Sequence, residues 1–136
     1  MTATAAGPIK GLPVDQDTSN ARYATDLVGS DRPKKLYAAR VLKRRVRTAW
    51  KVAARPGADL HTLEARQTLS EFDTLVAPRC IRQLADKATR KACAAILGFL
   101  ETPAALAPLR TQLDDSTSWC ERRALERALK RVEQAR

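Results

Sequence analysis

The stretch RQLADKATRKACAAILGFLETP, residues 82–103, decides the fold. Leu84 precedes a short polar turn that contains Asp86, and basic residues then open a helix that we expect over residues 89–100. Within that helix, small residues such as Ala and Cys recur before Leu97. Small inner residues let neighbouring helices approach closely, while larger ones fill the gaps between layers. The stretch therefore predicts a short helix, a tight turn and a longer helix with an alanine-rich inner face.

Two other stretches show the same arrangement: DLVGSDRPKKLYAARVLKRR, residues 26–45, and TQLDDSTSWCERRALERALKRV, residues 111–132. Each has one leucine before an Asp-bearing turn and another in the helix that follows, namely Leu27 and Leu42 in the first and Leu113 and Leu129 in the second. One helix pair cannot bury its own apolar face, so it stacks on the next pair. The three stretches predict stacked antiparallel helix pairs.

This pattern resembles the HEAT-repeat family, in particular the short repeats also found in phycobilisome-lyase-type repeat proteins. The best match consists of Leu84, Asp86, Arg90, Ala94 and Leu97, with weaker matches at Leu27, Asp31, Ala39 and Leu42 and at Leu113, Asp115, Ala124 and Leu129. The resemblance implies a scaffold that binds other macromolecules, and it carries over no catalytic residue. The spacing is irregular, with an insert around residues 59–79, so a plain helical bundle is the alternative.

The composition agrees with an all-α fold. Of the 136 residues, 44% are hydrophobic and five are Gly. Ala, Leu, Arg and Glu favour helices, and β-branched runs are few. We expect a single domain over residues 20–136, a HEAT-like α-solenoid or a small helical bundle. Caps and helix breakers place its helices at residues 21–28, 33–54, 60–76, 78–84, 89–100, 104–113 and 118–134.

An extended, flexible arm is expected before this domain, over residues 1–19. It is rich in Thr, Ala, Gly and Pro. Either it is a tail, or Ile9, Leu12 and Val14 dock on a partner or on the domain itself.

The positive charge is concentrated in one segment. The net charge is +10, from 25 basic and 15 acidic residues, and residues 32–55 hold ten basic residues and no acidic one. The remaining chain has 15 basic and 15 acidic residues and is neutral.

On a helical wheel, one face of the segment 32–55 is apolar and carries Leu36, Ala39, Leu42, Val46, Ala49, Trp50 and Ala53. Another face carries a basic stripe, which consists of Arg40, Arg44, Arg47, Lys51 and Arg55 with Lys43 at its border. Lys34 and Arg45 are expected elsewhere on the exposed surface.

The basic stripe predicts an anionic partner. Each like-charge pair at i,i+4 costs about 0.2–0.5 kcal/mol, and no Glu is interleaved to relieve it. An acidic protein surface is our first expectation. The phosphate backbone of nucleic acid is the close rival, bound without regard to sequence. A lipid surface is disfavoured, because the alanine-rich apolar face offers little to insert. The competing interpretation is a face that is merely solvated, or one paired with Glu64, Glu71 or Asp73.

No recognisable catalytic set is present. The single His, His61, lies near Glu64 at a helix start and is expected to be solvated. Asp114 and Asp115 are expected to cap the last helix or to complement the positive charge at its N-terminus. We therefore predict a non-catalytic scaffold or adaptor within a larger assembly, with no metal, no cofactor and no small-molecule substrate.

The cysteines and the hydropathy indicate the compartment. Cys80, Cys93 and Cys120 lack the close spacing of a zinc site, so we expect reduced, mostly buried thiols. Reduced thiols are typical of the cytoplasm. No run of residues approaches the ~20 apolar residues of a membrane span.

Overall fold

The computed structural model describes residues 17–57 and 59–135, and within them every regular element is helical. The elements are α1 (Asn20–Leu27), α2 (Arg32–Ala53), α3 (Leu60–Leu75), α4 (Ala77–Gln83), α5 (Arg90–Leu100), the 3₁₀ turn η1 (Pro103–Ala105), α6 (Leu106–Asp115) and α7 (Trp119–Gln134). The all-α prediction is confirmed. Most of the predicted N-terminal arm, including Ile9, Leu12 and Val14, lies outside the described residues.

Side chains at helix N-termini set most of the boundaries. Each of four N-cap side chains accepts a hydrogen bond from a backbone N–H three residues later; the caps are Ser19, Asp31, Asp59 and Ser118. The hydrogen bonds from Thr62 lower the pKa of the Asp59 carboxyl. The prediction that Asp114 and Asp115 cap the last helix is wrong, because α6 continues through both residues and Ser118 is the cap.

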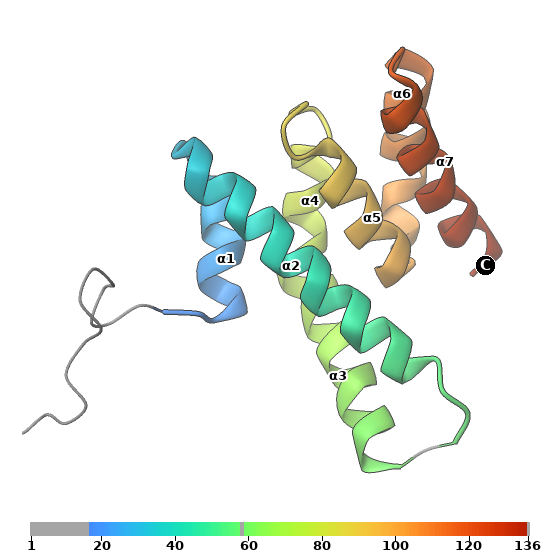
Figure 1. Ribbon diagram of the computed structural model, residues 1–136. Helices are drawn as coiled ribbons and strands as arrows, with labels where there is room; N and C mark the ends of the chain where they lie inside the picture. Colours follow the sequence, from blue (N-terminus) through green and yellow to red (C-terminus); the bar gives the residue numbers. More distant parts are fainter. Residues whose placement is uncertain (1–16, 58, 136) are drawn as a thin grey trace, which may run out of the picture.

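The helices form three consecutive pairs, α1–α2, α4–α5 and α6–α7, with α3 inserted between the first two pairs (Figure 1). Each of the three similar stretches of sequence therefore spans the turn of one pair and most of its second helix. The second helices, α2, α5 and α7, lie in one layer, in which α5 packs against α2 on one side and α7 on the other. The inserted α3 packs along the C-terminal half of α2.

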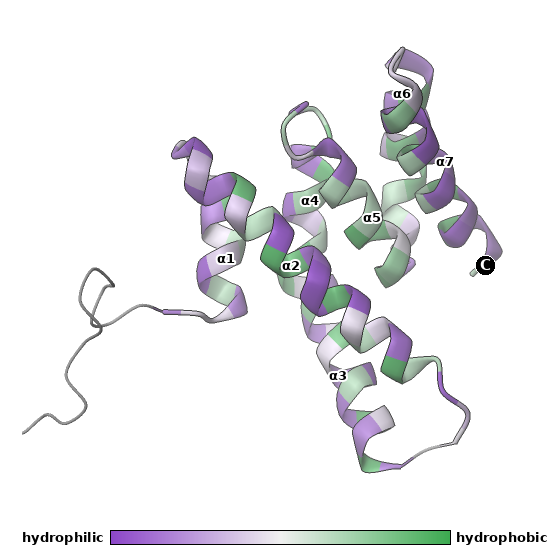
Figure 2. Ribbon diagram, in the orientation of Figure 1, coloured by the Kyte–Doolittle hydropathy of each residue, from purple (hydrophilic) through white to green (hydrophobic). Residues whose placement is uncertain are grey.

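The core lies between the helix layers and uses the leucines that the repeat singled out. Leu27, Leu42, Leu84 and Leu97 are fully buried, whereas Leu113 and Leu129 are half-buried in the last pair. Figure 2 shows hydrophilic residues recurring along α2 and α7, with the more apolar α5 between them.

The apolar face of α2 is broader than a single wheel face. Ala38 and Val41 are buried beside the predicted Ala39, Leu42, Val46 and Ala49, whereas Leu36, Trp50 and Ala53 are only half-buried. The reason is that α2 packs against α1, α3 and α5, so three neighbours cover it from different sides.

Two of the three cysteines are core residues. Cys80 in α4 and Cys93 in α5 are fully buried, and the hydrogen bond with the Cys93 thiol together with burial raises the pKa of Cys80 well above its ordinary value. Cys120 is exposed and is the one exception to the prediction of mostly buried thiols. The buried positions of α7 are Glu121, Leu125, Ala128 and Val132, and Cys120 lies off that face.

A thiol-directed reagent is expected to modify one cysteine quickly in the native chain and all three in denaturant. Only a thiolate in contact with solvent reacts, and both Cys80 and Cys93 lack solvent contact. Mass spectrometry after brief labelling checks the count, and Cys120→Ser is the control that should abolish the fast reaction. Fast modification of a second thiol would contradict the packing of α4 on α5.

Candidate anion-binding groove

The predicted basic stripe is exposed. Arg40, Lys43, Arg44, Arg47, Lys51 and Arg55 all have exposed side chains, and none forms an ion pair within the described residues. Within the same residues, Glu64 and Glu71 form no ion pair, and Asp73 accepts a hydrogen bond of 2.8 Å from the Thr102 hydroxyl. The described carboxylates therefore leave the stripe available.

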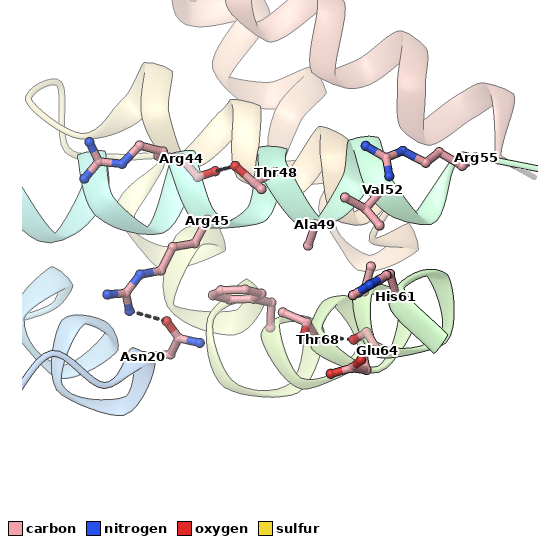
Figure 3. A pocket seen from close by; sticks show the side chains of 12 residues that line it. Asn20, Arg44, Arg45, Thr48, Ala49, Val52, Arg55, His61, Glu64 and Thr68 are labelled. Atoms are coloured by element: carbon pink, nitrogen blue, oxygen red, sulfur yellow. Dashed lines mark hydrogen bonds between the residues drawn. The ribbon is translucent and has the colours of Figure 1, made fainter. Parts of the chain in front are cut away.

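Two other cations of the same segment have structural partners instead. Arg45 was expected on the exposed surface, but it is half-buried and donates to the Thr18 carbonyl at 2.8 Å and to Asn20 Oδ1 at 2.7 Å (Figure 3). It also lies over the Tyr23 ring, 5.1 Å from the centroid, which ties α2 to α1. Lys35 Nζ lies 2.8 Å from Asp86, and this bond is the main cause that lowers the pKa of the Asp86 carboxyl.

A groove with cationic walls crosses the layer of second helices. It has a volume of about 430 Å³ and is lined by Lys43 and Arg47 of α2, Lys91 and Ala95 of α5, and Ala124, Arg127 and Arg131 of α7. We call these seven residues the basic groove. Five of them are cations contributed by three helices, two are alanines, and none is acidic. Lys43 and Arg47 also belong to the basic stripe, so the two surfaces are continuous.

The residue types on the three helices explain why the surface is hollow there. Lys43 and Arg47 of α2 form one wall, and Arg127 and Arg131 of α7 form the other. The middle helix α5 contributes the small residue Ala95 to the floor between them.

Arg131 is held in place by aromatic rings. Its guanidinium carbon lies 4.6 Å from the Phe99 ring centroid and 5.6 Å from that of Trp50. The two rings also contact each other, with centroids 5.2 Å apart. A guanidinium stacked on a ring face keeps the donors at its edge. The contacts join α7, α5 and α2 and fix one cation of the groove before any ligand binds.

Sequence reasoning found the α2 side of the groove and missed Lys91, Arg127 and Arg131. Only α2 has an unbroken run of cations, whereas α7 has Glu121, Glu126 and Glu133 among its basic residues. The repeat register does not supply the missing signal, because it places Arg127 and Arg131 at the positions of Arg40 and Arg44, which lie outside the groove lining.

The other chemistry considered from the sequence has little structural support in the described residues. They contain no group of three or more His, Cys, Asp or Glu that could hold a metal ion. His61 is exposed in the first turn of α3. None of the helices described combines the length and the apolar character that crossing a membrane requires.

Comparisons with protein-family models, with curated proteins and with solved structures find no match to this chain. The resemblance to HEAT repeats stays a prediction that rests on the residues quoted above. The structure adds the order of the helix pairs, with α3 inserted where the spacing of the similar stretches is irregular.

Proposed function

We propose that this protein is a non-catalytic adaptor that binds an acidic protein partner through the basic groove and the adjoining basic stripe. The observation that carries the proposal is the groove itself, in which five cations from three helices meet without a carboxylate. Nearby like charges repel one another, and an anionic ligand relieves that repulsion. The resemblance to HEAT repeats supports the same kind of role, because it implies a macromolecular scaffold.

The chemistry of the groove favours extended acidic ligands. Arginine binds carboxylates through two parallel hydrogen bonds, and the groove has three arginines on its two walls. The electrostatic potential of a surface that carries only positive charges also speeds association with a negatively charged partner. The alanine floor lets a ligand backbone approach closely between the walls.

Nucleic acid is the second candidate, because the same cations could follow a row of phosphates. Five phosphate contacts would give a salt slope of about −4.5 on duplex DNA and about −3.5 on a single strand. The groove has no aromatic lining residue on which a base could stack. Trp119 is exposed, but it lies outside the groove lining and Arg123 covers its ring at 5.3 Å. Such binding would be blind to sequence.

Charge reversal in the groove is expected to abolish binding. The test variant carries Lys43→Glu, Arg47→Glu and Arg127→Glu, and each reversal removes two units, so the net charge falls from +10 to +4. Losing three charge-assisted contacts of about 1 kcal/mol or more each predicts a loss of ~100-fold or more in affinity. Fluorescence anisotropy with labelled polyglutamate, oligo-dT and duplex DNA, each at low and moderate salt, measures the effect.

A matched variant separates local charge from net charge. Lys34→Glu, Arg82→Glu and Lys87→Glu change three exposed cations that line neither surface and give the same net charge. We expect its affinity to stay within ~3-fold of the native value, and circular dichroism to show both variants folded. If the native chain binds oligo-dT or duplex DNA in a salt-sensitive way but does not bind polyglutamate, nucleic acid replaces the acidic protein as the proposed partner. If the native chain and the groove variant bind these ligands equally well, both the acidic-protein proposal and the nucleic-acid proposal are refuted.

A further inference from the structure

A second hollow lies on the other side of α2, between α2 and α3. It has a volume of about 670 Å³, and Ala49 and Val52 point into it from α2 (Figure 3). Ala65 and Phe72 of α3 complete its apolar floor. We call these four residues the floor of the α2–α3 pocket. Ala49, Ala65 and Phe72 are nearly inaccessible, so the floor consists of well-packed side chains.

The pocket exists because two small residues occur where α2 and α3 face each other. Both Ala49 and Ala65 belong to the buried faces of their helices. Larger residues at these positions would fill the space between the helices, as Phe72 does further along α3. Binding pockets are usually apolar hollows of this size with a few polar groups at the rim.

The rim has opposite charges on its two sides. Arg44 and Arg55, both members of the basic stripe, lie on the α2 side, and Glu64 lies on the α3 side with His61 beside it. Arg44 also lines the surface of the stripe, so the pocket opens directly onto it. An acidic ligand is attracted along α2 and repelled by Glu64 across the pocket. This asymmetry favours one orientation, with carboxylates over α2 and an apolar group directed at the floor.

We infer that the α2–α3 pocket receives one large apolar side chain, such as Trp, Phe or Leu, from the acidic partner segment that binds the basic stripe. The inference rests on the proposed function and identifies the kind of partner. Protein interfaces draw most of their affinity from a few anchors that enter pockets, while surrounding charges set orientation and association rate. The half-buried Val52 gives this pocket a larger accessible apolar side chain than the alanines of the basic groove, and the surface of the stripe has no apolar lining residue.

The test uses two labelled acidic peptides that differ at one position, with Trp in one and Ala in the other, flanked by glutamates. Burying a large apolar side chain predicts ~10- to 100-fold tighter binding of the Trp peptide to the native full chain. Ala65→Leu, which fills the pocket, is expected to remove this preference while leaving the affinity for the Ala peptide unchanged. Thr68→Met, at a half-buried lining position, repeats the test at lower risk to folding.

The controls make each outcome decisive. Ala107→Leu makes the same change at an exposed position of α6 and should keep the native preference. If the native chain binds both peptides equally well, the inference that the pocket receives an apolar side chain is overturned, and the proposed function still stands. Binding of neither peptide would overturn both. If the preference emerges only after Ile9→Ser, Leu12→Ser and Val14→Ser, the chain's own N-terminal residues occupy the pocket, and the partner side chain is the wrong occupant.

Discussion

Gly98→Val is expected to lower the free energy of unfolding by about 3 kcal/mol, at the upper end of typical overpacking costs. Gly98 lies on the face of α5 that packs against α7. A Cβ atom at this position would lie 2.9 Å from Ala128 Cα and 3.2 Å from Ala128 Cβ. The nearer atom belongs to the backbone of α7 and cannot rotate away. The two helices must therefore move apart, and the contacts on both sides of Gly98 are lost.

Chemical denaturation followed by circular dichroism measures this effect. Gly98→Ala should cost less than valine, because a gain of about 1 kcal/mol in helix propensity offsets part of the same clash. Adding Ala128→Gly should give only partial rescue, since it removes the contact at 3.2 Å and keeps the one at 2.9 Å. Gly29→Ala is the control and should cost little, because its nearest contact would be an ordinary 3.4 Å. A native-like Gly98→Val variant would mean that α5 and α7 are not in this close contact.

The same substitution connects packing with the candidate site. Arg127 and Arg131 belong to α7, and their distance from Lys43 and Arg47 depends on how closely α7 packs on α5. Gly98→Val should therefore weaken binding in the groove as well as stability, although it changes no charge. A loss of stability without any loss of affinity would indicate that binding uses the α2 side alone.

The helices could be predicted from the sequence because local signals determine where they begin. Asp31 with Pro33, and Asp59, each combine a capping side chain with a helix-forming sequence, and the structure starts helices there. The cap of α7 could not be chosen in this way. Asp114, Asp115 and Ser118 are all good caps, and only the packing of α6 through Asp115 decides among them.

The availability of each cation could not be predicted from α2 alone. Lys35 and Arg45 belong to the same run of cations as Arg40 and Arg44, and nothing within that run shows which of them have partners. They differ in their tertiary neighbours, which are Asp86 for Lys35 and the Thr18 carbonyl, Asn20 and Tyr23 for Arg45. Similarly, the α7 side of the groove depends on how the helix pairs stack, which a wheel of one helix does not contain. The sequence therefore predicted a charged face, and the structure identified a groove.

Equivalent positions in the three similar stretches of sequence show how the helix pairs are joined. Lys35, Arg90 and Arg122 each lie seven residues before a repeat leucine. Lys35 pairs with Asp86 of the second helix pair, and Arg90 pairs with Glu121 of the third at 3.0 Å. Arg122 donates instead to the Leu113 and Ser116 carbonyls of its own pair. One basic residue per pair thus links or closes the stack, and Arg90 holds the most buried of these links.

Arg90→Met is expected to destabilise the fold by about 3 kcal/mol, which corresponds to a fall of roughly 10 °C in Tm. The Arg90 side chain is 16% exposed and that of Glu121 is 9% exposed, so the carboxylate would be left buried without a cation. The Leu84 carbonyl would lose a hydrogen bond of 2.8 Å as well. The hydroxyl of Ser116 still donates to Glu121 at 3.2 Å, which keeps the cost at the lower end for a broken buried pair.

An exposed pair and a double variant separate charge burial from lost packing. Arg110→Met breaks the pair with Glu133, which is shorter at 2.8 Å but has side chains 55% and 46% exposed, and should cost less than about 0.5 kcal/mol. Adding Glu121→Gln to Arg90→Met removes the buried charge and should recover much of the loss, because no unpaired carboxylate remains. A deficit that Glu121→Gln does not reduce would show that Arg90 acts through packing and its bonds to the Leu84 and Ala85 carbonyls, not through the charge of Glu121.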